Sequence, residues 1–231
     1  MKAFEYIRQS FFFFRQHLAT IAAIQLPFVI VLNLVAYWVT GQMTEGDKID
    51  MAPLAILNLA SLTVLPIYWG ATILYLQSVV DNEPVRPLQA IVWALKYWRH
   101  LLITYLLTGL AVFAGLLMLI VPGIFIGTRL SFAEYICVLE EKKAVASLKQ
   151  SWEQSEAYFS LLLQGLLILF GGLMAVELIT LDLIGSEEPQ PYEVVISVIF
   201  DLLGALATIY GFRIYCVMKA DYKSGNININ H

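Results

Sequence analysis

Residues 101–121 read LLITYLLTGLAVFAGLLMLIV, and no charged side chain interrupts them. A helix of about 20 apolar residues spans the roughly 30 Å hydrocarbon core of a bilayer. Because five further long apolar stretches accompany this one, the chain is predicted to cross a membrane six times. The expected spans are Leu18 to Thr40, Leu54 to Val80, Leu101 to Val121, Ile124 to Leu139, Phe159 to Ile184 and Tyr192 to Met218.

The composition excludes an ordinary soluble domain. Hydrophobic residues make up 59% of the 231 residues and charged residues only 14%, whereas a soluble domain is about one quarter charged. The apolar runs show no period-two alternation, so helices rather than a barrel must satisfy the backbone polar groups in lipid. The predicted fold class is all-α, a polytopic membrane helix bundle that forms a single domain over residues 1–231. The fourth span directly follows Val121-Pro122-Gly123, which predicts a tight helical hairpin at that point.

The cations predict the orientation. Of the 14 Lys and Arg residues, 11 fall on one side of the predicted spans, while Lys48 lies opposite and Arg129 and Arg213 lie within spans. Cytoplasmic loops retain Lys and Arg, so both termini are expected in the cytoplasm. The first apolar run is longer than a signal-peptide core and is expected to be retained. The 11 cations are Lys2, Arg8, Arg15, Arg86, Lys96, Arg99, Lys142, Lys143, Lys149, Lys219 and Lys223.

A threefold internal repeat is predicted, with units of approximately 1–80, 81–140 and 141–219. Pro66-Ile-Tyr-Trp-Gly70 matches Pro122-Gly-Ile-Phe-Ile-Gly127, and Gly211-Phe-Arg-Ile-Tyr215 occupies the equivalent place in the third unit. Each unit would consist of one cytoplasmic helix and one membrane hairpin. Chance similarity between apolar segments is the alternative, but the ordered recurrence favours a repeat.

The segments before the third and fifth spans are predicted to be amphipathic helices in the cytoplasmic interface. Apolar residues recur at helical spacing in both, namely Leu88, Ile91, Val92, Leu95 and Trp98 in the first, and Val145, Leu148, Trp152 and Phe159 in the second. Such helices anchor topology, and their cations can also attract anionic headgroups. The candidate headgroup contacts are Arg15 with His17 and Arg99 with His100, each of which is more simply an interfacial anchor.

Three sequence segments carry a family resemblance. They are residues 120–139, IVPGIFIGTRLSFAEYICVL, residues 144–152, AVASLKQSW, and residues 210–215, YGFRIY. Together they resemble the YciC-type family of uncharacterised bacterial inner-membrane proteins. The resemblance implies an inner-membrane location and a multi-pass fold, and it implies no established activity. The central stretch is also similar to the membrane domain of some glycerophosphodiester phosphodiesterases, but the polar loops here are too short to hold a phosphodiesterase domain.

Charged residues inside the spans are the remaining functional signal. A charge at the bilayer centre costs roughly 2.5 to 3.5 kcal/mol even on lenient scales, so such residues need partners or water. Arg129, Glu134 and Asp201 form the candidate intramembrane polar site. In one interpretation Arg129 and Asp201 pair as a clamp between helices; in the other, the three residues line a polar cavity for an ion, a proton or an amphiphile.

Enzymatic function is not expected. His17, His100 and His231 lack a metal-binding spacing, and nucleotide-binding and nucleophile motifs are missing from the sequence, so we expect no metal and no cofactor. Cys137 and Cys216 are expected to stay reduced. No cationic segment is large enough to bind a nucleic acid. The sequence therefore predicts a non-catalytic integral inner-membrane protein that interacts with membrane lipids or envelope proteins, or alternatively a small transporter or lipid-handling protein.

Overall fold

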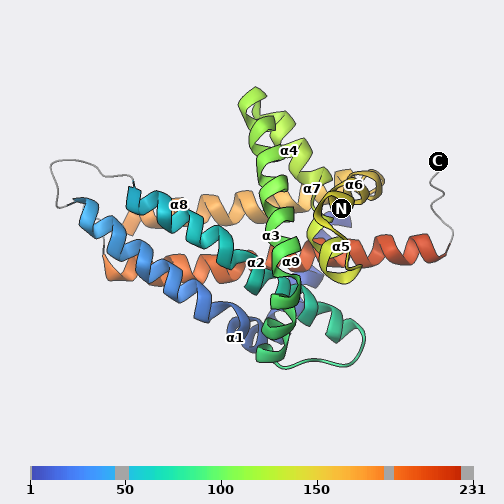
Figure 1. Ribbon diagram of the computed structural model, residues 1–231, viewed down its shortest axis with the longest axis horizontal. Coiled ribbons are helices and arrows are strands. Elements are labelled where there is room, and N and C mark those ends of the chain that lie inside the picture. The colour runs from blue at the N-terminus through green and yellow to red at the C-terminus, as the bar shows by residue number, and fades with distance from the viewer. Residues whose placement is uncertain (1, 45–51, 185–189, 225–231) are drawn as a thin grey trace.

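The computed structural model describes residues 2–44, 52–184 and 190–224, and every regular element in these ranges is a helix (Figure 1). Six apolar helical segments are long enough to cross a membrane, as predicted. They are Ala3–Gly41, Ala52–Val80, Pro87–Met118, Ile120–Leu139, Phe159–Leu183 and Pro191–Lys223. The helices are α1 (Lys2–Thr44), α2 (Ala52–Val80), α3 (Pro87–Met118), α4 (Ile120–Arg129), α5 (Ala133–Leu139), α6 (Ala144–Gln154), α7 (Phe159–Leu166), the π-helix η1 (Leu167–Gly171), α8 (Gly172–Ile184) and α9 (Pro191–Lys223).

The segment before the third span is not a separate helix. It forms the first turns of α3, which begins at Pro87 and continues without a break to Met118. Proline suits the first position of a helix because its missing N–H would have no partner there. No Gly or Pro separates Trp98 from Leu101, so nothing in the backbone ends the helix at the expected boundary.

A hairpin joins α3 to α4, but it turns at Leu119 rather than at Pro122-Gly123. Leu119 is extended, with φ −168° and ψ 158°, and Pro122 lies in the first turn of α4, where its missing N–H is tolerated. Gly123 instead allows close helix packing, since a Cβ added there would lie 2.4 Å from Leu116 Cδ2. In Figure 1 the hairpin stands crosswise to α1, α2, α8 and α9, and its tip projects from them.

The fourth span is broken, which the sequence reading did not predict. The helix stops at Arg129 and restarts at Ala133 as α5. Serines of the α6 segment satisfy the backbone groups at the break: Ser151 and Ser155 Oγ donate to the Arg129 carbonyl at 2.9 and 2.8 Å, and the Phe132 N–H donates to Ser151 Oγ at 3.1 Å. A break inside an apolar segment is tolerated where such partners replace the lost helical bonds.

Helix α6 packs through small residues and leaves part of its apolar stripe exposed. Ala144, Ser147 and Ser151 are buried, whereas Val145 and Trp152 are exposed. The start of α3 has the same arrangement, with Ala90 and Ala94 buried and Leu88, Val92 and Leu95 exposed. Small residues let helices approach closely in membranes, and part of each predicted apolar stripe stays exposed, while Ile91, Trp98 and Leu148 are half-buried.

The buried core lies towards one end of the bundle. It forms where the first half of α1 meets the last halves of α2 and α9 and the short helix α5. Its largest fully buried side chains include Ile21, Ile24, Leu76, Tyr135, Tyr210 and Met218. Towards the other end, the long helices expose apolar side chains such as Val31, Ile56 and Val176, as helices that face lipid do.

Candidate functional site

Arg129 ends α4 and is buried, but its partner is not Asp201. Its Nη2 atom lies 3.2 Å from Glu156 Oε2, and its guanidinium lies 5.1 Å from the centre of the Trp152 ring. The Glu156 side chain is 79% exposed and the Arg129 side chain only 8%, so the pair lies at the surface with its cation covered and its carboxylate in solvent. The break that follows Arg129 places this residue against the end of α6, and the predicted Arg129–Asp201 clamp is therefore wrong.

Asp201 pairs instead with an asparagine of α1. Asn33 Nδ2 donates to Asp201 Oδ2 at 2.7 Å and also to the Val29 carbonyl at 3.0 Å. Helices α1 and α9 pack side by side, so this contact joins two neighbouring spans. A neutral amide thus bonds the carboxylate that the clamp interpretation paired with Arg129.

Glu134 lies in the first turn of α5, directly after the break. The Tyr105 hydroxyl of α3 donates to its Oε2 atom through a short hydrogen bond. Glu134 also lines a small cavity between α2, α4, α7 and α9. It is the one member of the predicted set Arg129, Glu134 and Asp201 that lies in the wall of any cavity described here.

The predicted headgroup contacts lie on two different helices. His17 Nδ1 of α1 lies 2.7 Å from the Tyr75 hydroxyl, and its ring stacks on Phe13 with centroids 4.3 Å apart. Arg15 is exposed on the same helix, and Arg99 and His100 are exposed on α3. His17 therefore has a packing role, while the other three side chains are exposed, and their contact with headgroups stays a prediction.

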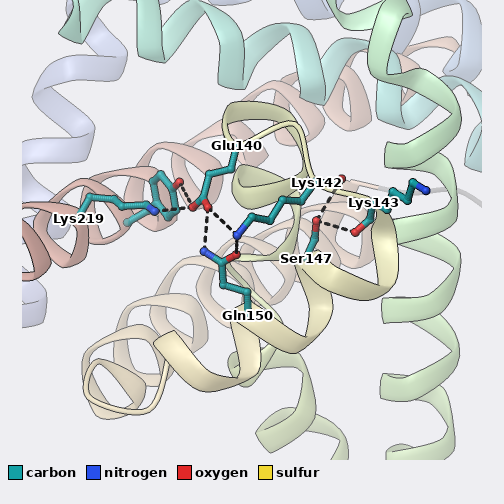
Figure 2. A network of polar contacts seen from close by, with 7 residues as sticks. Glu140, Lys142, Lys143, Ser147, Gln150 and Lys219 are labelled. Carbon is teal, nitrogen blue, oxygen red and sulfur yellow. Dashed lines mark hydrogen bonds and ion pairs between the residues drawn. The ribbon is translucent and has the colours of Figure 1, made fainter. Parts of the chain in front are cut away.

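A polar cluster that sequence reasoning missed surrounds Glu140, immediately after α5 (Figure 2). Lys219 Nζ lies 2.5 Å from Glu140 Oε1, and Tyr215 donates to the same oxygen at 2.9 Å. Gln150 donates to Oε2 at 2.9 Å, and Lys142 Nζ lies 3.4 Å from that oxygen. The cluster joins the end of α5 to α6 and α9. In the sequence, Glu140-Glu141-Lys142-Lys143 reads as a solvated loop, so no local signal distinguishes Glu140.

These contacts set the protonation of Glu140. Burial by itself would raise the pKa of this carboxyl, but the hydrogen bonds from Lys219, Gln150 and Tyr215 together outweigh burial and hold the pKa below its ordinary value. Glu140 is therefore an anion at neutral pH and fixes the three elements to one another.

The largest described cavity, about 610 Å³, lies between α1, α2 and α9. Arg8 and Arg213 contribute its cationic groups, and Arg213 Nε donates to Gln9 Oε1 at 3.3 Å. Of the lining residues that the structure describes, none is acidic. Its apolar wall consists of Phe12, Phe13, Leu76, Val80, Ile209 and Phe212. The sequence reading gave neither arginine a role in a site, because each resembles an interfacial anchor.

Two further cavities are described. A mostly apolar one of about 330 Å³ lies between the α3–α4 hairpin and the α7–η1 segment, and the one beside Glu134 has a volume of about 150 Å³. Within the described ranges, His, Cys, Asp and Glu side chains nowhere gather in a group of three that could hold a metal ion. Cys137 and Cys216 are free thiols.

Comparisons with known proteins place this chain in a family. The model of an uncharacterised protein family, UPF0259, matches residues 37–217. A UPF0259 membrane protein of Sodalis glossinidius is 28% identical over 177 residues, which cover 76% of this chain and 70% of that protein. One from Yersinia pestis strain Pestoides F is 27% identical over 191 residues, or 81% of this chain and 73% of its own length. No solved structure matches the chain. The protein belongs to UPF0259, an uncharacterised family of multi-pass membrane proteins of bacteria.

Proposed function

We propose that this protein is a non-catalytic inner-membrane protein that binds a lipid with an anionic headgroup in the cavity between α1, α2 and α9. One observation carries the proposal: a cavity of about 610 Å³ combines two arginines with an apolar wall and has no described acidic lining residue. Its volume falls within the roughly 300–1,000 Å³ of small-molecule sites. An amphiphile matches this combination because it presents an anion and an acyl chain together.

The chemistry of the two arginines favours a phosphate headgroup. A guanidinium offers several N–H donors in a plane and binds phosphate oxygens through paired hydrogen bonds. Arg213 has a neutral partner in Gln9, so its positive charge is not cancelled there. Phe12 and Phe13 of α1 and Ile209 and Phe212 of α9 supply the surface against which acyl carbons would pack.

The proposed orientation places this cavity on the cytoplasmic side. Arg8 is near the start of α1, Val80 ends α2, and Arg213 lies in the last third of α9, so the cavity belongs to the cation-rich end of the sequence. Reporter fusions after Lys223 and in the 81–86 loop should report cytoplasm. Fusions in the 45–51 and 185–189 segments, which lie outside the described residues, should report periplasm. A periplasmic C-terminus would overturn this orientation.

We also propose that the chain consists of the three predicted repeat units and that α6 lies at the cytoplasmic membrane interface. Similar connections support the repeat: the loops before α3 and α6 each contain a residue with positive φ, Asn82 at 60° and Glu141 at 53°. In both cases an extended residue, Arg86 or Lys143, precedes the helix. The exposed Val145 and Trp152 of α6 support its contact with the interface. The YciC-type name and the likeness to phosphodiesterase membrane domains stay predictions.

Transport is the less favoured alternative. A transport site at Asp201 requires a cavity that reaches this residue, but Asp201 lines none of the three cavities described above. The contact between Asp201 and Asn33 accounts for this carboxylate as a link between helices. Lipid binding therefore fits the described cavities better than transport through a site at Asp201.

Lipid titration in mixed micelles tests the proposal. The purified chain in a neutral detergent would be titrated with phosphatidylglycerol or phosphatidylcholine, and binding followed by the thermal unfolding midpoint and by native mass spectrometry. Phosphatidylglycerol should bind selectively. Each arginine near an anionic lipid contributes ~1 kcal/mol, so Arg8→Gln or Arg213→Gln should weaken binding about fivefold and the double variant about 25-fold.

The control is Arg86→Gln, which removes an exposed cation that does not line the cavity. It should bind phosphatidylglycerol as the native chain does. Inorganic phosphate would separate a lipid from a soluble anion: equal protection by phosphate alone, equal binding of both lipids, or equal weakening by Arg86→Gln would each contradict the proposal.

A further inference from the structure

A second polar site lies on the other face of α9 from the lipid cavity. The cavity of about 150 Å³ is lined on α9 by Ala207, Thr208 and Gly211, whereas the lipid cavity is lined by Ile209, Phe212 and Arg213. Residues three apart share a helix face, so the two cavities use different faces of one helix. The polar residues of the smaller cavity are Ser131, Glu134, Tyr135 and Thr208.

Thr208 has an unused hydroxyl in this cavity. The residue is 2% exposed, and its Oγ1 atom has no hydrogen-bond partner among the described protein atoms. Other buried threonines of the bundle behave differently: Thr72, Thr104 and Thr128 each donate to the carbonyl four residues earlier, at 2.8 Å. A buried polar atom without a partner is costly, so the Thr208 oxygen is expected to contact something inside the cavity.

Glu134 brings a carboxyl group without a cationic partner to the same place. The Tyr105 hydroxyl donates to its carboxylate, which suits the ionised form. Within the described part of the chain, no Lys, Arg or His forms an ion pair with Glu134, and Arg129, five residues earlier, is paired with Glu156. An ionised carboxylate inside an apolar bundle needs a compensating positive charge.

The break in the fourth span builds this site. It ends α4 before Ser131 and starts α5 at Ala133, which places Glu134 beside the cavity. Tyr135 donates to the Thr208 carbonyl at 2.9 Å, and Gly211 lets the Tyr135 ring approach, since a Cβ added there would lie 2.5 Å from its hydroxyl oxygen. Ser131 Oγ donates to the Thr128 carbonyl and keeps lone pairs available to accept.

We propose that this cavity binds a small monovalent cation, for which Na⁺ is the probe. Glu134 would supply the negative charge, and the hydroxyl oxygens of Thr208 and Ser131 would act as neutral ligands. Oxygen ligands suit hard cations, and one carboxylate matches one positive charge. A water molecule takes about 30 Å³ of liquid volume, so a cavity of about 150 Å³ can hold an ion with part of its hydration shell.

Cation-dependent stability of the full-length chain tests the proposal. The thermal unfolding midpoint would be measured in neutral detergent as choline chloride is replaced by NaCl at constant ionic strength, and saturable binding of radioactive sodium would be measured by flow dialysis. A ligand that binds the folded state raises the midpoint as its concentration passes its Kd. The native chain should therefore show a saturable rise with Na⁺ and saturable sodium binding.

Two substitutions and one control assign the site. Glu134→Gln keeps the side-chain shape and should abolish both the rise and the binding. Thr208→Val should raise the half-saturating Na⁺ concentration at least tenfold, and it keeps the proposal testable if Glu134→Gln fails to fold. Glu156→Gln removes an exposed carboxylate outside the cavity and should leave the Na⁺ response unchanged.

Three results would overturn the proposal. They are a native chain with equal stability in Na⁺ and choline, a Thr208→Val variant with an unchanged half-saturating concentration, and a Glu134→Gln variant that still binds sodium. None of these outcomes bears on the lipid cavity, so the two proposals can fail separately.

Discussion

Gly165 allows the closest packing between α7 and α9, and Gly165→Ala should destabilise the bundle. A Cβ added at Gly165 would lie 1.9 Å from Tyr210 Cζ, whereas ordinary contact begins near 3.4 Å. The Tyr210 ring would have to move by about 1.5 Å, the difference of these distances. The ring is fully buried, and its hydroxyl donates to the Leu161 carbonyl at 2.6 Å, so the movement would also break that bond.

The magnitude follows from three contributions. Overpacking costs about 1–3 kcal/mol, and the lost hydrogen bond costs about 0.5–1.5 kcal/mol. The higher helix propensity of alanine returns about 1 kcal/mol. The sum is a loss of about 0.5–3.5 kcal/mol in the free energy of unfolding. For a chain of this size a loss of about 2 kcal/mol lowers the thermal midpoint by about 4–8 °C.

Thermal unfolding in detergent, followed by circular dichroism, measures the effect. The matched control is Gly204→Ala on α9, where an added Cβ meets no atom within 4 Å, and its stability should be unchanged or slightly higher. Tyr210→Leu in the Gly165→Ala background should recover part of the loss, because it removes the clashing ring atoms. Equal midpoints for Gly165→Ala and Gly204→Ala would refute the packing argument.

Other substitutions test the polar contacts. Arg129→Gln and Asp201→Asn should change the free energy of unfolding additively, within about 0.5 kcal/mol in denaturant titrations, because the two residues have different partners. Strong coupling between the two substitutions would restore the rejected clamp. Ser151→Ala should lower the free energy of unfolding by about 1–3 kcal/mol, because it leaves the Phe132 N–H without a partner. Ser155→Ala should cost less, because the Arg129 carbonyl still accepts a hydrogen bond from Ser151. A larger loss for Ser155→Ala than for Ser151→Ala would count against the assigned bonds. The lowered pKa of Glu140 stabilises the fold above the ordinary value of 4.5, and this contribution should disappear as the pH falls through the lower folded pKa. In a pH series of thermal midpoints Glu140→Gln should therefore lose less stability on acidification than the native chain, and identical acid profiles would contradict this.

The sequence determined the number and approximate bounds of the apolar spans, because the length of a hydrophobic segment is a local property that the bilayer selects directly. The predicted spans overlap all six helical segments. Glu134 could also be singled out locally, since a carboxylate in an apolar run is rare enough to require an explanation.

Only the tertiary structure decided which polar groups meet. The partner of a charge depends on how each helix is rotated and where it breaks, and these depend on contacts between distant segments. Ser151 and Ser155 satisfy the backbone at a break 19 or more residues away in the chain, and that break directs Arg129 towards Glu156. The pattern of apolar residues within 120–139 predicts neither the break nor the partner of Arg129. The same holds for Arg8 and Arg213, because two cations 205 positions apart share a cavity only after α1 and α9 have packed together.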